Sequence, residues 1–171
     1  MKITAQEEYG LRCLLQLARV PQGQIVTVKE IAAKEGLSSA YVEKLLRVLS
    51  QAGLVHSIRG MKGGYALNRA AGLISLGEVV RALGKVQTTD HICRQFTGNQ
   101  QACVHFSNCG IRSMWAGLTT YIQSFLDQTT LANLLQSEYL VSEHLAKRLG
   151  GLAYNTKSTR KRVKDDGTVG N

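Results

Sequence analysis

Three cysteines gathered in one short segment are the residues of this chain best suited to chemistry. Cys93, Cys103 and Cys109 fall within residues 85–110, where neither a helical nor a strand period is visible. Cysteine thiolates bind soft metal ions and iron–sulfur clusters, and free thiols also undergo reversible oxidation. The segment is therefore expected to hold a metal centre or to respond to oxidants.

Nothing in the sequence favours an enzyme. There is no nucleotide-binding loop and no Ser/His/Asp constellation. Cys103 and His105 are the one Cys-His combination considered as a catalytic nucleophile and base, and we do not favour that role. The chain has no CxxC pair, which disfavours a structural zinc site. The fourth cysteine, Cys13, lies beside the apolar stripe of a predicted helix, and we interpret it as a buried core residue.

The net charge of the 171-residue chain is +9, and it is unevenly distributed. Residues 1–85 carry 12 Lys and Arg against 6 Asp and Glu, residues 86–154 carry 4 against 4, and residues 155–171 carry 5 against 2. Positive charge placed in this way attracts the phosphates of nucleic acid. No apolar run is long enough to span a bilayer and no signal peptide is apparent, so we expect no membrane partner and a cytoplasmic location, where thiols stay reduced.

Apolar spacing and capping residues predict three helices in the first third of the chain. The first covers about residues 5–20, the second follows a capping box at Thr27 and stops at Gly36, and the third runs from the cap Ser38 to Gly53. Two short helices joined by a Gly-containing turn form the helix-turn-helix pattern. The polar face of the third helix is expected to contact DNA, and it consists of Ser39, Tyr41, Glu43, Lys44 and Arg47.

These polar side chains suit different parts of a duplex. Lys44 and Arg47 are expected to bind phosphates, whereas Ser39, Tyr41 and Glu43 are candidates for base edges. A carboxylate such as that of Glu43 accepts a hydrogen bond from a cytosine amino group and is repelled by phosphate, which gives it discriminating power.

A hairpin follows the third helix. Residues 54–58 and 65–67 are predicted to be strands, and the turn between them is rich in glycine. Gly63 permits close approach of the backbone to another surface, and Arg59 and Lys62 supply two cations. The hairpin is therefore predicted to be a wing that presses on DNA phosphates.

A long helix is predicted after the cysteines. Its apolar residues Ile111, Trp115, Leu118, Ile122 and Phe125 recur at alternating steps of four and three, which is the seam of a coiled coil. Such a helix is expected to form a homodimer, and a homodimer suits a palindromic operator with two half-sites. The alternative is that this face packs within its own subunit.

The predicted fold class is mainly α, a winged helix-turn-helix domain with a small β-hairpin wing plus a long dimerisation helix. The expected division is a DNA-binding domain over residues 1–84, a cysteine loop over 85–110, the dimerisation helix and a terminal helix over 111–150, and a basic disordered tail over 151–171.

Several stretches resemble the IscR/NsrR (Rrf-type) winged-helix regulators of bacteria. They are the opening residues 1–4, Tyr9–Arg12, Ser39–Leu45, Gly53–Val55, Arg59–Gly60, Gly63–Tyr65 and the three-cysteine loop. The resemblance covers about residues 1–145. It implies a homodimeric transcriptional regulator, most often a repressor, in which a long helix crosses its mate beside an iron–sulfur cluster.

The resemblance implies that Cys93, Cys103 and Cys109 ligate a [2Fe–2S] or [4Fe–4S] cluster. Nine residues separate the first two cysteines and five the last two, so the first interval is longer than is usual in the family. Some relatives supply a histidine three residues after the last cysteine, where this chain has Arg112, which cannot ligate. Others use a carboxylate from the first helix of the partner subunit, and Glu8 occupies that position. His91 and His105 are the alternative fourth ligands.

Two other hypotheses keep the DNA-binding domain. The cysteines could act without metal as a thiol switch, or the protein could be controlled by a partner enzyme, as in a branch of the family that tends to lack the cysteines. The signal sensed by a cluster could be redox state, nitric oxide, or the supply of iron or clusters.

Overall fold

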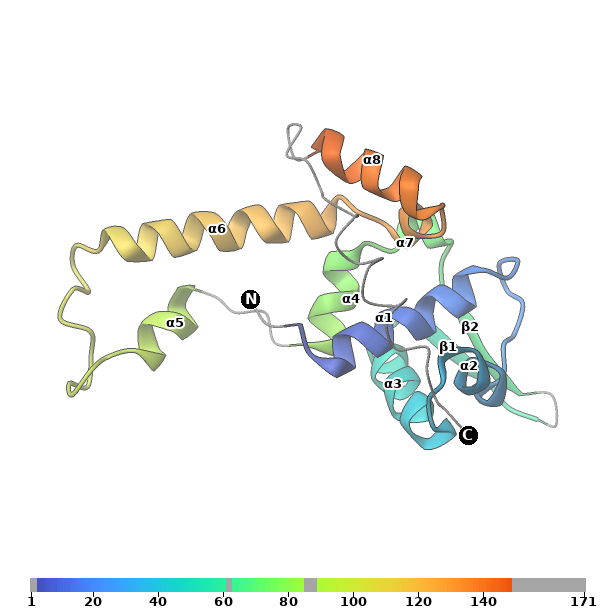
Figure 1. The fold of residues 1–171 in the computed structure, drawn as a ribbon. Helices are drawn as coiled ribbons and strands as arrows, with labels where there is room; N and C mark the ends of the chain where they lie inside the picture. Colours follow the sequence, from blue (N-terminus) through green and yellow to red (C-terminus); the bar gives the residue numbers. More distant parts are fainter. Residues whose placement is uncertain (1–2, 61–62, 85–88, 149–171) are drawn as a thin grey trace, which may run out of the picture. The chain divides into compact units, whose positions relative to one another are not determined.

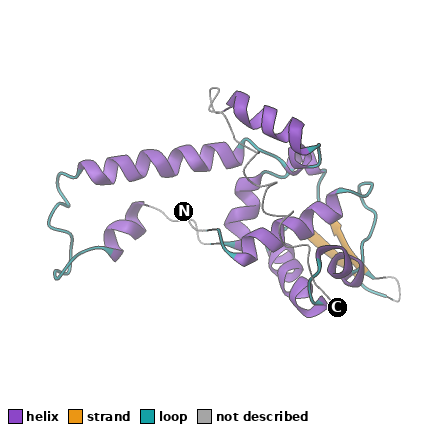
Figure 2. Cartoon of the chain, viewed as in Figure 1, coloured by secondary structure: helices purple, strands orange, loops and turns teal. Residues whose placement is uncertain are grey.

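The computed structural model describes residues 3–60, 63–84 and 89–148, and Figure 1 shows its elements. Met1–Leu135 form one compact unit and Gln136–Asn171 a second. Helices dominate, and the sheet found among the described residues is a two-stranded antiparallel hairpin (Figure 2). The predicted fold class is confirmed. Lys62 and the predicted basic tail lie outside the described residues.

Three helices form the framework of the first unit: α1 (Ala5–Ala18), α2 (Val28–Glu35) and α3 (Ser39–Gln51). Each follows a Ser or Thr whose hydroxyl accepts a hydrogen bond from a backbone N–H of the first turn, a donor that has no partner within the helix. α2 ends at Gly36, whose φ of 65° favours glycine. The second and third helices therefore begin where their caps predict.

The wing is the hairpin of β1 (Val55–Ile58) and β2 (Gly64–Leu67), paired antiparallel from Val55 opposite Leu67 to Ile58 opposite Gly64. Val26 forms an isolated antiparallel bridge with β2, because its N–H and C=O each bond to Tyr65 at 2.9 Å. A Cβ on Gly64 would collide with the Val26 carbonyl oxygen, so this pairing requires glycine at that position. The wing is thereby anchored to the segment that leads into α2.

The core of the first unit lies between α1, α2, α3, the wing and α4 (Leu76–Leu83), and it is closed by η1 (Ala71–Leu73) and α7 (Leu131–Leu134). The largest fully buried side chains are Leu14, Ile31, Val42, Leu45, Leu46, Leu49, Leu54, Val55, Ile74, Val79, Thr129 and Leu131. Cys13 is fully buried among them, as its place beside the apolar stripe predicts, and burial raises the pKa of its thiol to about 11.

Beyond α4 lie α5 (Thr89–Gln95) and the long helix α6 (Gly110–Asp127). α5 was not predicted, because it is short and has no apolar period. The ion pair between Asp90 and Arg94, one turn apart at 3.2 Å, supports it. Cys93 therefore lies on a helix rather than in an irregular loop.

The second unit contains α8 (Glu138–Arg148), in which Glu143 and Lys147 form an ion pair one turn apart at 3.0 Å. Among the residues that the structure describes, no helix is both long and apolar enough to cross a membrane.

Candidate DNA interface and cysteine site

The exposed face of α3 carries the residues predicted to contact DNA. Its opposite face is buried through Val42, Leu45, Leu46 and Leu49, so the orientation of the helix is fixed by the core. This packing leaves a polar surface that faces solvent, made up of Ser39, Glu43, Lys44 and Arg47. A helix packed on one side and polar on the other is the form in which a recognition helix enters a major groove.

Three of the residues predicted to contact DNA already interact with other side chains of this chain. The carboxylate of Glu43 pairs with Arg47 at 3.5 Å, one turn away, with both side chains more than half exposed. The Tyr41 ring is half-buried and meets the Tyr9 ring edge-on at a centroid distance of 6.1 Å. Tyr41 therefore ties the first turn of α3 to α1, in addition to any contact with a base.

Arg12 and Glu35 form a partly buried ion pair that was not predicted from the sequence. Arg12 Nε donates to Glu35 Oε2 at 2.6 Å and Gln16 donates to the other carboxylate oxygen, while the Glu35 side chain is only 8% exposed. The hydrogen bond to Glu35 is the main reason that the pKa of the Arg12 guanidinium is raised. Arg12 also lies 5.4 Å from the centroid of the Tyr9 ring. This network fixes α1 to the end of α2, and its signal in the sequence was a single arginine in a largely apolar helix.

The tip of the wing is shaped by glycine. Gly60 has a φ of 124°, and the N–H of Gly63 donates to its carbonyl at 2.9 Å. A Cβ on Gly63 would lie 2.9 Å from that same carbonyl oxygen, closer than side chains normally approach. Arg59 is exposed beside this turn, so a cation and a tight backbone occur together, as a phosphate contact requires.

Cys93 and Cys103 line one shallow depression of about 260 Å³, together with Asp90, Arg94 and Phe106 among others. Both thiols are partly exposed and unbridged. Cys109 lies outside this depression and caps α6, where its sulfur accepts a hydrogen bond from the Arg112 N–H at 3.4 Å. The positive end of a helix stabilises a thiolate, so this position suits a metal ligand.

The donor chemistry of the segment fits an iron–sulfur cluster, because three partly exposed thiols lie close in sequence and none is bridged. Within the described residues, however, no three side chains of Cys, His, Asp or Glu are close enough together to hold a metal ion. A cluster would therefore have to draw Cys109 towards the depression that Cys93 and Cys103 share.

The candidate fourth ligands are accessible. Glu8 is exposed on α1, whereas its neighbour Glu7 is occupied in the capping box with Thr4. His91 and His105 are also exposed. A side chain on α1 must be exposed to solvent if it is to bind a metal centre held by a second subunit.

Arg112 holds the cysteine segment against α6. Its guanidinium donates to the Phe106 carbonyl at 2.7 Å and lies 5.5 Å from the centroid of the Phe106 ring. Arg112 therefore has a structural role in this chain.

α6 leaves its apolar side chains uncovered. The exposed fraction is 66% for Ile111, 38% for Trp115 and 45% for Leu118, all members of the predicted seam. Met114 and Tyr121, which the step pattern did not include, are 53% and 55% exposed. The helix thus carries a continuous apolar stripe that the other elements of the first unit leave exposed.

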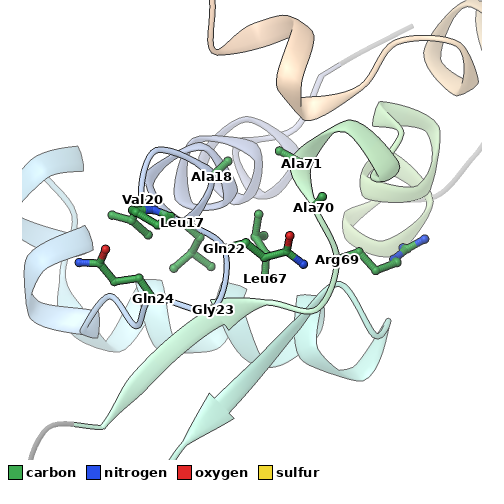
Figure 3. A pocket seen from close by; sticks show the side chains of 11 residues that line it. Leu17, Ala18, Val20, Gln22, Gly23, Gln24, Leu67, Arg69, Ala70 and Ala71 are labelled. Atoms are coloured by element: carbon green, nitrogen blue, oxygen red, sulfur yellow. The ribbon is translucent and has the colours of Figure 1, made fainter.

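A separate cavity of about 130 Å³ lies where the loop after α1 meets β2 and η1 (Figure 3). Leu17 and Leu67 are among its apolar lining, and Gln22, Gln24 and Arg69 are polar members of it. Its volume is below the range usual for small-molecule sites, and neither the cysteines nor the exposed face of α3 lines it.

Residues 3–137 match the family described as Rrf2, iron-dependent transcriptional regulator. The chain belongs to the Rrf2 family. The resemblance seen in the sequence is thereby confirmed, and members of the Rrf2 family are named as transcriptional regulators. The chain is accordingly a DNA-binding transcriptional regulator and not an enzyme.

Relatives in the Rrf2 family span most of the chain. The protein rrf2 of Nitratidesulfovibrio vulgaris is 34% identical over 140 residues, covering 82% of this chain and 91% of that protein. The HTH-type transcriptional regulator IscR of Vibrio vulnificus is 32% identical over 141 residues, covering 82% of this chain and 81% of that protein.

Solved structures of Rrf2-type regulators share the fold. The structure of T. potens IscR gives a TM-score of 0.62 at 32% identity and covers 79% of this chain and 86% of that chain. CymR, described as the global cysteine regulator of B. subtilis, gives 0.64 at 30% identity and covers 79% of this chain and 96% of that chain.

Proposed function

We propose that this regulator is a homodimer whose affinity for a palindromic operator is set by an iron–sulfur cluster held by Cys93, Cys103 and Cys109. The observation that carries the proposal is the position of three unbridged thiols directly before α6, with Cys109 as the cap of that helix. A change at these sulfurs acts on the N-terminal end of the helix that is proposed to join the two subunits. Residues 85–110 would then be the sensing segment between a DNA-binding domain, 1–84, and a dimerising segment, 111–150.

The exposed stripe on α6 supports the homodimer. Proteins that remain monomeric rarely expose a contiguous apolar patch of this kind. In a two-fold dimer the same surface of each subunit meets its copy, so one apolar stripe is sufficient to make the interface. The dimer interface would bury the most exposed members of the predicted seam, which are Ile111, Trp115 and Leu118.

In the proposed dimer, two copies of α3 enter major grooves about one helical turn, roughly 34 Å, apart. Lys44 and Arg47 on the helix, with Arg59 and Lys62 on the wing, would neutralise phosphates, and the Gly63 backbone would approach the duplex closely. Ser39, Tyr41 and Glu43 would meet base edges. Glu43 would have to exchange its ion pair with Arg47 for a base, so it would be a discriminating contact.

When bound, the cluster would supply a redox-active centre whose potential depends on ligand type, charge and hydrogen bonds to sulfur. The chain's own contribution is to orient Cys109 at the N-terminus of α6 and to donate the Arg112 N–H to its sulfur. Glu8 of the partner subunit is the proposed fourth ligand, with His91 or His105 as alternatives. A carboxylate or histidine ligand makes metal binding sensitive to pH and readily lost, which suits a sensor.

Metal analysis of protein purified without oxygen tests the proposal. We expect iron, acid-labile sulfide and charge-transfer absorption in the wild type, and their loss in Cys103→Ala. Cys13→Ala is the matched control, because that thiol is fully buried in the core, and it should retain the cluster. A colourless protein that also resists reconstitution with iron and sulfide would contradict the proposal.

A metal-free thiol switch is the second candidate, and the depression shared by Cys93 and Cys103 favours it. Oxidation by a peroxide would join the two sulfurs, with two electrons and two protons passing from the thiols to the peroxide, which is reduced to water and an alcohol, or to two waters for hydrogen peroxide. This candidate predicts a protein without iron in which operator affinity follows the redox state of the Cys93–Cys103 pair and recovers with dithiothreitol.

A further inference from the structure

The C-terminal end of α6 is joined to the winged helix by a compact set of contacts. Arg81 Nη1 on α4 pairs with Asp127 Oδ1, the last residue of α6, at 2.8 Å. The Asp127 carboxylate lies against Gly77 in the first turn of α4, where a Cβ would overlap it. A carboxylate at this place also meets the positive end of α4. The fit between the two helices therefore depends on an acid at one position and glycine at the other.

Backbone hydrogen bonds on both sides of this pair prevent it from being a loose surface contact. The Leu76 N–H donates to the Thr129 carbonyl at 2.7 Å, and the Leu131 N–H donates to the Ile74 carbonyl at 3.0 Å. Thr129 is 1% exposed and Leu131 is fully buried. The chain directly after α6 is thus fixed to the segment that begins α4.

The opposite end of α6 carries Cys109 and the exposed apolar stripe. An 18-residue helix is about 27 Å long. A rigid rod of this length, fixed at one end, transmits a rotation imposed on it to whatever the fixed end holds. The fixed end of α6 holds α4.

α4 in turn is fixed to the helices that meet DNA. It packs against α1 and α3. The Gln6 side chain on α1 donates to the Leu83 carbonyl at 2.6 Å, and a Cβ on Gly10 would lie 2.5 Å from the Leu83 side chain. Helices this close move together, so a displacement of α4 reaches α3 through the core.

We infer that Arg81 and Asp127, seated on Gly77, are the positioning residues that couple the state of the cysteine segment to the orientation of the recognition helix. The inference rests on the proposed function, in which that state sets operator affinity. Loss of the pair leaves the cysteines and the DNA-binding face in place, and the backbone hydrogen bonds of Leu76 and Leu131 still hold the chain after α6. Without the side-chain contact, α6 itself can turn about its own axis without moving α4.

The test compares operator affinity of the full chain with the cluster loaded and after its removal by a chelator. The probe is a fluorescent duplex selected from a random-sequence pool by the wild-type protein. Asp127→Asn removes the charge, and Gly77→Ala displaces the carboxylate without changing any charge. Arg69→Gln is the matched control, because Arg69 pairs with Glu78 on α4 at 2.9 Å with similar exposure, and its hydrogen bonds go to Leu73 and Glu78 rather than to α6. Melting temperature and cluster absorption are measured on each variant.

The ratio of the two dissociation constants is the decisive quantity. Coupling between two sites commonly changes affinity about 5- to 150-fold, and we expect such a ratio in the wild type and in Arg69→Gln. Asp127→Asn and Gly77→Ala should bring it to within about two-fold of one, with the cluster absorption unchanged. Arg81 and Asp127 are about half exposed, so the pair contributes little to stability and the variants should fold.

Two results would overturn the inference while leaving the proposed function standing. One is a wild-type affinity ratio in both Asp127→Asn and Gly77→Ala, and the other is an equal fall of this ratio in Arg69→Gln. A wild-type protein that loads a cluster but shows no difference in affinity would refute the proposed function itself, and the inference with it.

Discussion

The apolar stripe on α6 leads to a quantitative prediction about subunit association. Leu118 is 45% exposed in the single chain, and complete burial of a leucine side chain contributes about 1.5–3 kcal/mol. Covering that exposed part therefore contributes about 1 kcal/mol in each subunit, or about 2 kcal/mol in a two-fold dimer. Leu118→Ala should weaken the dimer dissociation constant about 30-fold.

Sedimentation equilibrium over a concentration series measures this constant directly. Leu73→Ala is the matched control, because Leu73 is the same residue type, is 68% exposed and lies on η1 rather than α6. It should leave the constant unchanged. Equal dissociation constants for the two variants, or a wild type that is monomeric at all concentrations, would refute the assignment of α6 as the dimer interface.

Three further predictions follow from other parts of the chain. Arg47→Ala should lower the slope of log affinity against log salt by about 1.8 in the proposed dimer, the value for one phosphate contact in each subunit, and an unchanged slope would exclude that contact. The pKa of Glu78 is lowered, first by its hydrogen bond with Arg69, so its charge stabilises the folded chain above the unfolded pKa near 4.5 and this is lost as pH falls through the lower folded value. Urea unfolding should therefore separate wild type from Glu78→Gln at pH 7, and progressively less as the pH falls below the unfolded pKa and through the lower folded pKa of Glu78. A gap that does not change with pH would contradict this. Burial and a raised pKa of about 11 should keep Cys13 from iodoacetamide in the folded, reduced protein while the other three cysteines react, and rapid labelling of all four would contradict it.

The elements with strong local signals were predictable from the sequence. The capping box at Thr27 lies where the expected second helix begins, because a hydroxyl and a carboxylate three residues apart satisfy the same backbone donors in any context. The glycine-rich turn predicted the wing for a similar reason. Gly60 adopts a positive φ, a backbone conformation that residues other than glycine rarely adopt.

Features that depend on distant partners were not predictable. α5 has no apolar period, and the link from Arg12 to Glu35 joins residues far apart in the chain. Tyr41 was expected on the polar face of α3, yet its ring packs on Tyr9 of another helix. In each case the deciding contact is tertiary, so no local spacing indicates it.

The cysteine segment shows the same division. Its thiols and its position before a long helix could be read from the sequence, and Cys109 does cap α6. The sequence could not predict that Cys93 and Cys103 share a depression while Cys109 lies outside it. This arrangement depends on how α5 and the following turns pack. The interaction of Arg112 with Phe106 was likewise hidden, since the side chain folds back onto its own segment.

Operator affinity of one anaerobic preparation, measured before and after removal of its cluster, tests the central claim most directly. We expect a change of about 5-fold or more in the wild type and in Cys13→Ala. Cys103→Ala should bind DNA with the affinity of the cluster-free wild type under both conditions. Equal affinity of the loaded and cluster-free wild type would contradict the claim that a cluster on these cysteines controls DNA binding.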